Sequence, residues 1–266
     1  MELRAPSHWQ TLDFVSDLHL QDSYPRTLRG FIDYLDTSPA DAIFILGDLF
    51  EFWIGDDWID EPQDAHRQCL DAMARAGQRL ALHIMRGNRD FLMGPRLMEV
   101  CGAHDLPDPV TLVFSGERIV LSHGDALCTG DIRYQEFRQL SRADAWQRNF
   151  LAEPLAGRKS RMLGMRAQSE ANKKASTTFF DVDNHAALAL LQRCQASTLV
   201  HGHTHKPDRH ALDAQHTRWV LTDWDLDGST PRSGVLRLRA AAHSRQAAAT
   251  PGPLRWERVA GSGLTA

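Results

Sequence analysis

Five short blocks of this chain carry acidic, amide and histidine side chains at spacings that suit metal binding. They are Ser-Asp-Leu-His at 16–19, Gly-Asp at 47–48, Gly-Asn-Arg-Asp at 87–90, Ser-His-Gly-Asp at 122–125 and His-Gly-His-Thr-His at 201–205. Asp17 and His19 are two residues apart, so in an extended segment their side chains point the same way. His203 and His205 repeat that spacing. Carboxylate oxygens mixed with imidazole nitrogens suit manganese, although zinc and iron are also compatible with such a set.

The candidate ligands are too many for one four-coordinate ion. They comprise two carboxylates, one amide and four imidazoles: Asp17, His19, Asp48, Asn88, His123, His203 and His205. This inventory predicts two metal ions, with Asp48 as the natural bridge between them. Paired metal ions activate water and hold phosphoryl oxygens during in-line displacement. The set therefore predicts hydrolysis of a phosphate ester or a phosphate anhydride.

Each block alone is a weak signal. A Gly-Asp pair after an apolar run is often a simple turn, and a single histidine at a strand end usually serves packing. The combination is stronger, because every block follows a short apolar run, at 12–15, 42–46, 80–85, 119–121 and 198–200. Such runs, closed by polar residues, are typical of buried strands. Side chains at the carboxyl ends of neighbouring strands meet at one edge of a sheet, which is where α/β proteins bind ligands.

The segments between these runs predict an α/β chain with an insertion. Apolar residues recur at helical spacing over 25–35, 66–76, 96–101 and 185–194, and Ser115-Gly116 predicts a hairpin. We expect 218–221 and 235–238 to be strands of an antiparallel sheet. Residues 131–184 break the rhythm and are helical and basic, so we interpret them as a helical cap. The expected domain is 11–240, with residues 1–10 frayed and 241–266 a peripheral tail.

Composition excludes several classes of protein. The formal net charge of −4 gives no reason to expect nucleic-acid binding. The N-terminus shows no signal-peptide pattern, and no apolar run approaches the roughly 20 residues that span a bilayer. The four cysteines are scattered along the chain, which is typical of reduced thiols in a cytosolic protein.

The extended motifs resemble a known family. They are Asp-Leu-His-Leu at 17–20, Gly-Asp-Leu-Phe-Glu at 47–51, Trp-Ile-Gly-Asp-Asp at 53–57, Gly-Asn-Arg-Asp-Phe at 87–91, Ser-His-Gly-Asp-Ala-Leu-Cys-Thr at 122–129 and His-Gly-His-Thr-His-Lys-Pro at 201–207. Across residues 12–224 the chain resembles the UDP-2,3-diacylglucosamine hydrolase family of the calcineurin-like metallophosphoesterase superfamily. The resemblance implies an α/β fold, a four-layer αββα metallophosphoesterase sandwich with a helical cap insertion.

The resemblance also implies roles for individual residues. Two Mn²⁺ ions would be held, the first by Asp17, His19, Asp48 and His205 and the second by Asp48, Asn88, His123 and His203. Arg89, Asp48 and Asn88 would be catalytic. Substrate contacts would come from Asn88, Arg89, Asp131, Ser169, Asn172, Lys173 and His203. Asp90 and Asp125 would orient the metal ligands.

The implied reaction splits the pyrophosphate of UDP-2,3-diacylglucosamine into UMP and 2,3-diacylglucosamine 1-phosphate, a step of lipid A biosynthesis. It would take place at the cytoplasmic side of the bacterial inner membrane, on a peripheral, monomeric enzyme. A general dinuclear-metal phosphodiesterase or protein phosphatase of the same superfamily is the alternative, and a non-catalytic scaffold is a third hypothesis. The complete ligand set argues against a scaffold.

Arg89 favours the anhydride substrate on physical grounds. Many phosphoesterases of the superfamily have a histidine here, which can protonate a leaving alkoxide. A leaving phosphate needs no such proton, and a permanently charged guanidinium that binds phosphate oxygens serves it better. The alternative is that Arg89 is a structural ion-pair partner of Asp90.

The apolar residues of the cap have two interpretations. Trp146, Phe150, Leu155, Met162 and Met165 could line a slot for acyl chains, with Arg158, Lys159, Arg161 and Arg166 meeting anionic lipid head groups. They could equally form a small core of the cap, beneath a solvated basic face. The resemblance favours the lipid-binding interpretation.

Overall fold

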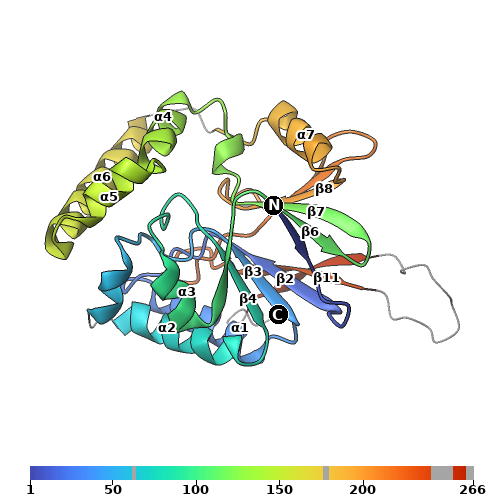
Figure 1. Cartoon of the computed structure of the whole chain (residues 1–266), viewed down its shortest axis with the longest axis horizontal. Coiled ribbons are helices and arrows are strands. Elements are labelled where there is room, and N and C mark those ends of the chain that lie inside the picture. Colours follow the sequence, from blue (N-terminus) through green and yellow to red (C-terminus); the bar gives the residue numbers. More distant parts are fainter. Residues whose placement is uncertain (62–63, 176–179, 241–253, 262–266) are drawn as a thin grey trace, which may run out of the picture.

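Two six-stranded mixed β-sheets face each other in this chain (Figure 1). The computed structural model describes residues 1–61, 64–175, 180–240 and 254–261, without the side chains of 168–175. The first sheet has the order β12 (Arg255–Ala260), β11 (Gly234–Arg239), β2 (Thr11–Val15), β3 (Ala42–Leu46), β4 (Ala81–Met85) and β5 (Ala103–Leu106). The second has the order β1 (Glu2–Arg4), β6 (Val110–Phe114), β7 (Glu117–Ser122), β8 (Thr198–His201), β10 (Thr217–Val220) and β9 (Arg209–Ala211).

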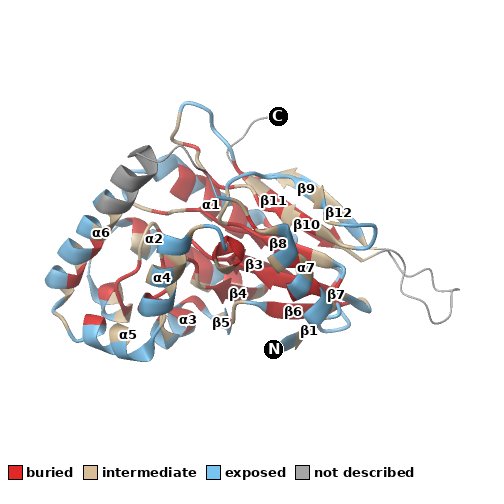
Figure 2. Cartoon of the chain, turned by 90° about the horizontal axis from the view of Figure 1, so that it is seen from above, coloured by how far each residue is buried: buried red, intermediate tan, exposed pale blue. Residues whose placement is uncertain are grey.

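Helices cover the outer faces of both sheets. Helices α1 (Pro25–Thr37), α2 (Asp64–Gly77) and α3 (Pro95–Cys101) lie on the first sheet, and α7 (Asn184–Arg193) lies on the second (Figure 1). One apolar core, which includes Phe14, Phe44 and Leu112, fills the space between the sheets, and two further cores lie beneath the helices. Strands buried on both faces need nearly continuous apolar runs, which is why β2 and β3 are buried along their whole length (Figure 2). The predicted four-layer αββα sandwich is confirmed.

The strand directions bring the polar blocks together. Strands β2, β3 and β4 run parallel in the first sheet, and β7 and β8 run parallel in the second. Each of these five strands is followed directly by one of the polar blocks. Their carboxyl ends therefore gather at one end of the sandwich, as the sequence predicted.

The insertion folds into three helices that stand beside that end, α4 (Ile132–Ser141), α5 (Asp144–Leu151) and α6 (Leu155–Ala175) (Figure 1). Two short 3₁₀ helices, η1 (Asp56–Asp60) and η2 (Asp125–Leu127), lie in the loops that face the cap. Phe150 and Met162 are buried within the core beneath the first sheet, and Trp146 and Leu155 pack against it. These four apolar residues therefore attach the cap to the main domain and do not line an open slot. Met165 is half-buried.

Three expectations about the periphery are corrected. Residues 1–10 contain β1, which pairs with β6, and the tail expected at 241–266 contains β12, which pairs with β11 along six residues. The expected boundaries at 11 and 240 thus leave out two strands of the sheets. Strands β10 and β11 do not share a sheet, because β10 pairs with β8 and β9 whereas β11 pairs with β2 and β12. Across the described residues, none of the helices combines the length and the apolar composition needed to cross a membrane.

Candidate metal centre

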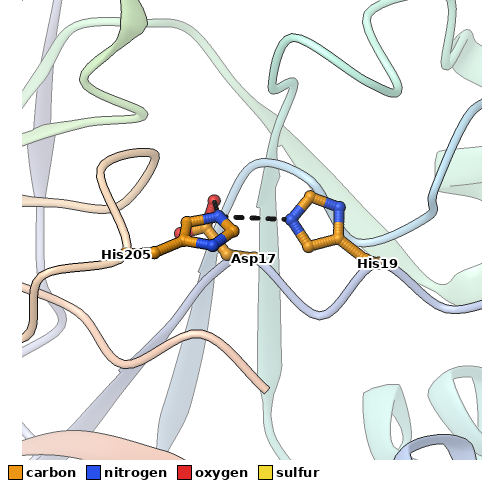
Figure 3. A group of neighbouring side chains, drawn as sticks. All are labelled: Asp17, His19 and His205. Carbon is orange, nitrogen blue, oxygen red and sulfur yellow. Dashed lines mark hydrogen bonds and ion pairs between the residues drawn. The ribbon is translucent and has the colours of Figure 1, made fainter. Parts of the chain in front are cut away.

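One half of the centre consists of Asp17, His19 and His205, which converge from the ends of β2 and β8 (Figure 3). The Nε2 atom of His205 lies 3.4 Å from Nε2 of His19 and 3.4 Å from Oδ1 of Asp17. Asp48 closes this group, with its Oδ2 4.0 Å from Nε2 of His19. The four residues that the resemblance implies for the first metal therefore lie close together.

The other half is built around the side-chain oxygen of Asn88. This Oδ1 lies 2.9 Å from Nε2 of His123 and 2.8 Å from Nδ1 of His203. Nε2 of His123 lies 3.7 Å from Oδ1 of Asp48, so the two oxygens of that carboxylate face different halves of the centre. Asp17 is also close to this half, because donor atoms of Asp17, Asp48 and His123 lie within 4.8 Å of one another. All seven residues predicted as ligands are brought together.

The backbone at the centre adopts a conformation that residues other than glycine rarely take. Five of the predicted ligands have φ between 49° and 67°: Asp17, His19, Asp48, His203 and His205. Among the described non-glycine residues only Ser115 and Gln195 share a positive φ. Each such residue costs on the order of 1–3 kcal/mol, and this kind of strain concentrates at functional sites. Hydrogen bonds between the loops hold the geometry, since Leu18 N and His19 N both donate to Asp48 O.

Two glycines allow the loops to approach closely. A Cβ atom on Gly87 would lie 2.1 Å from Oδ1 of Asp48. Gly47 has φ of +89°, and a Cβ there would lie 2.5 Å from Nδ1 of His123. The glycines that precede Asp48 and Asn88 in the sequence motifs are therefore required by the packing of the centre.

Burial and mutual charge dominate the electrostatics. Burial would raise the pKa of Asp17, but the hydrogen bond and charge of His205, with the nearby His123 and His19, hold it well below its usual range. Burial likewise would lower the pKa of His123, but the carboxylates of Asp48, Asp125 and Asp17 raise it to about 9. Burial lowers the pKa of His203 to about 4. Burial and the charges of neighbouring groups therefore act in opposite directions on the pKa values of Asp17 and His123.

Three of the histidines have a second partner behind the ring. Nδ1 of His123 lies 2.9 Å from Leu46 O, and Nδ1 of His205 lies 3.4 Å from Oδ2 of Asp223. Nδ1 of His19 lies 3.0 Å from Oε2 of Glu51, within ion-pair distance but without the alignment of a hydrogen bond. A carbonyl or carboxylate in this position is typical of metal-ligating histidine, because it fixes the ring and raises its basicity. Neither Glu51 nor Asp223 was predicted from the sequence to support a ligand. Glu51 belongs to the block at 47–51, but Asp223 has no local signal.

The two acids expected to orient the ligands act through other groups. Asp90 accepts hydrogen bonds from Leu49 N and Gly87 N, each at 2.7 Å, and so joins the loop of Asp48 to the loop of Asn88. Asp125 accepts from Tyr134 Oη and, at 2.9 Å, from Arg138 Nε, both on α4. The ring of Tyr134 in turn lies against His203, with centroids 5.9 Å apart.

Arg89 lies at the centre and is not tied to Asp90. Its backbone N donates to Oδ1 of Asp48 at 2.8 Å, and its Nη1 lies 4.0 Å from Oε1 of Glu51. The carboxylate of Asp90 is instead engaged by the backbone amides. The structural alternative for Arg89, an ion pair with Asp90, therefore finds no support among these contacts.

The substrate contacts expected from the cap are only partly described. Asp131 is the N-cap of α4 and accepts from Tyr134 N at 3.1 Å. Ser169, Asn172 and Lys173 belong to α6, but their side chains lie outside the described residues.

The donor set fits divalent metal ions. The close groups of acids and imidazoles at this site offer several hard oxygen and nitrogen donors around shared points, and each half combines oxygen donors with imidazole, a mixture suited to divalent transition metals. Positive charge placed between buried Asp17 and Asp48 would offset their mutual repulsion.

Comparisons with known proteins show the family of this chain. Residues 11–207 match the model of the calcineurin-like phosphoesterase family. The UDP-2,3-diacylglucosamine hydrolase of Chromobacterium violaceum is 46% identical, over 80% of this chain and 90% of that protein. The proteins of the same name from Stenotrophomonas maltophilia and Bordetella pertussis are 42% and 40% identical, over 82% and 83% of this chain and 93% and 88% of their own. A solved archaeal phosphodiesterase superposes with a TM-score of 0.43 at 10% identity, covering 94% of this chain and 99% of its own.

Proposed function

We propose, from the premise that the chain belongs to the calcineurin-like phosphoesterase family, that it hydrolyses the pyrophosphate bond of UDP-2,3-diacylglucosamine. The products are UMP and 2,3-diacylglucosamine 1-phosphate, and the reaction belongs to lipid A biosynthesis. The relatives that cover most of the chain carry the name of this hydrolase, which supports the assignment.

The position of Arg89 is the observation that supports an anhydride substrate. Arg89 is 18% exposed at the edge of the candidate centre, close enough to the solvent side to meet a substrate phosphate. A fixed guanidinium stabilises negative charge on the phosphate that leaves, and it cannot act as a general acid. The general phosphodiesterase, which releases an alkoxide, would gain more from a histidine at this position.

The centre is completed by two divalent ions, for which we propose Mn²⁺. Asp17, His19, Asp48 and His205 would hold one, and Asp48, Asn88, His123 and His203 the other, with the two oxygens of Asp48 shared between them. When bound, the ions would supply Lewis acidity and activate water. The chain's own residues position the substrate, with Arg89 and Asn88 at the phosphate and His203 beside it. Asp131, Ser169, Asn172 and Lys173 are proposed to contact the substrate as well.

The cap supports a lipid substrate. Of the large apolar residues that are exposed in the described chain, five belong to the cap or the segment that follows it: Ile132, Leu140, Leu151, Leu163 and Phe180. These residues, unlike Phe150 and Met162, are available to acyl chains. We propose that the protein works as a monomer, bound peripherally to the cytoplasmic side of the inner membrane, where such a substrate resides. All seven proposed metal ligands come from one chain, so no second copy is needed to complete the centre.

Variants of Arg89 test the assignment. Arg89→Ala should cost about 2–4 kcal/mol of transition-state stabilisation, the scale of losing one charge-stabilising donor. Arg89→His should gain activity on an alkyl phosphodiester but should not restore pyrophosphate cleavage, because a leaving phosphate gains little from a proton. The measurement is kcat/KM on UDP-2,3-diacylglucosamine and on the diester, with metal content checked in each protein. Unchanged pyrophosphate cleavage by Arg89→Ala would remove the argument for an anhydride over a diester.

A further inference from the structure

Helix α6 of the cap reaches the metal centre through the side chain of Arg166. All seven candidate ligands lie outside the cap, yet Nη2 of Arg166 contacts Oε1 of Glu51, and its Nη1 donates to Glu51 O at 2.7 Å. Glu51 follows β3 within the loop that also carries Asp48. Arg166 is only 14% exposed and Glu51 only 12%, so this ion pair is shielded from solvent.

The same carboxylate lies behind a metal ligand. Its other oxygen, Oε2, is 3.0 Å from Nδ1 of His19, whose Nε2 faces His205 and Asp48. His19 is 15% exposed and its backbone is in the left-handed region. Glu51 thus has one oxygen on the cap and one on the centre. A carboxylate can orient an imidazole only if the carboxylate is itself held in place. Arg166 holds Glu51 in place, because it binds both the carboxylate and the backbone carbonyl of that residue.

The other half of the centre is held differently. His123 is backed by Leu46 O, which belongs to β3, and His203 meets Tyr134 of the cap only through ring packing. The cap supports this half through α4 and its C-cap instead: Arg138 pairs with Asp125, and Arg142 donates to Gly87 O at 2.8 Å. A defect in the contact of α6 should therefore weaken one half of the centre more than the other.

We propose that Glu51 and Arg166 are positioning residues for the ion held by His19, so that docking of α6 on Glu51 sets the affinity of that half of the centre. This inference rests on the proposed dinuclear centre but not on the identity of the substrate. The cap would then have two roles. Its exposed face is proposed to meet the lipid, and α6 would help to support the metal site.

The test measures Mn²⁺ binding to the metal-free protein by calorimetry, without substrate. Glu51→Gln should lower the affinity for one of the two Mn²⁺ ions by 10- to 100-fold, the usual effect of removing a partner behind a ligand. The affinity for the other ion should change by no more than a few-fold. Arg166→Met should lower the affinity for the first of these ions by a smaller factor, and Arg166→Lys should recover part of it, because lysine keeps the charge but not the two-pronged geometry. The double variant Glu51→Gln/Arg166→Met should be no weaker than Glu51→Gln, since both act through one contact.

Arg161→Met is the matched control. Arg161 also lies on α6, but it pairs with Glu153 inside the cap and touches no part of the centre. Its removal should leave both Mn²⁺ affinities unchanged. Equal weakening of both ions by Arg166→Met, or unchanged affinities in folded Glu51→Gln and Arg166→Met proteins, would overturn the proposal. Because no substrate is present, a wrong assignment of the substrate would change none of these outcomes.

Discussion

Two carboxylates four residues apart on one strand illustrate two ways to bury a negative charge. Asp13 lies within β2 and Asp17 lies just beyond its end, and both are completely buried. Asp13 receives two bonds from Arg237, at 2.7 and 2.8 Å, together with hydroxyl groups of Tyr34 at 2.9 Å and Ser38 at 3.1 Å. Asp17 receives Ser16 Oγ at 2.6 Å and the backbone N of His203, but it faces a second carboxylate and three imidazoles.

The difference separates a structural charge from a functional one. At Asp13 the chain supplies its own cation, in an ordinary strand, and the pair is complete. At Asp17 it supplies a second acid and imidazoles on a strained backbone, an arrangement that suits cations from outside. The core around Asp13 should therefore be indifferent to metal, and the centre around Asp17 should depend on it.

The largest effect is expected at the structural pair. Arg237→Met leaves Asp13 buried without its cation and should lower the free energy of unfolding by about 3–5 kcal/mol. Urea unfolding should give the same loss with and without Mn²⁺. The double variant Asp13→Leu/Arg237→Met should recover most of the stability, because neither charge then remains buried. A loss that depends on Mn²⁺ would show that the two regions are coupled and would break the comparison.

The second effect appears in activity. Asp48→Asn keeps the size of the side chain, and asparagine tolerates the left-handed backbone, but the carboxylate shared by the two halves is lost. We expect kcat/KM to fall more than a hundredfold, about 2.7 kcal/mol or more in the transition state. Unfolding of the metal-free variant should be no easier than that of the metal-free wild type, since repulsion from Asp17 is relieved. Near-normal turnover by the metal-loaded variant would rule out a shared carboxylate.

Each bound metal ion should stabilise the fold by a similar amount. At a free Mn²⁺ concentration of 100 times the dissociation constant, each site adds about 2.7 kcal/mol to the free energy of unfolding. Thermal unfolding should show this gain in the wild type and in Arg237→Met, and a clearly smaller gain in Asp48→Asn. If Asp48→Asn gained as much as the wild type, Mn²⁺ would be stabilising the protein elsewhere.

The smallest effect concerns a buried group that is kept neutral. His83 lies against Phe44 and Trp9, beside His104, and burial lowers its pKa to about 4. The unfolded chain then binds more protons between about pH 6.5 and pH 4, so His83 makes the fold less stable as the pH falls through this range. The difference amounts to about 2 kcal/mol at pH 5. His83→Phe should abolish this part of the acid sensitivity, measured as the change in unfolding free energy between pH 7.5 and pH 5. An unchanged acid sensitivity would show that His83 is readily protonated in the fold.

The elements that carry the centre could be predicted from the sequence because their signals are local. Strands buried on both faces give apolar runs, and the polar residues that end them stand next to those runs. Strands β1 and β12 escaped prediction, since each lies at the edge of its sheet and consists of exposed and half-buried residues. The partner of β1, strand β6, is also distant in the sequence, whereas β12 pairs with β11, the strand that precedes it.

The support of the centre escaped prediction for the same reason. Asp223 and Arg237 are isolated charges in the sequence. The role of Asp223 appears only when β10 pairs with β8, and that of Arg237 only when β11 pairs with β2. The cap shows another limit, because its apolar residues predicted a buried surface without indicating whether that surface faces acyl chains or the main domain. Phe150 and Met162 pack on the main domain, a choice that depends on where α5 and α6 are placed.

The most direct test of the centre is a titration of metal-free protein with Mn²⁺, in which bound metal per chain and hydrolysis of UDP-2,3-diacylglucosamine are measured together. We predict that two ions bind per chain, and that activity rises in step with occupancy of the second. Full activity with one bound ion, or activity that persists after complete removal of metal, would contradict a dinuclear centre at the ends of these five strands.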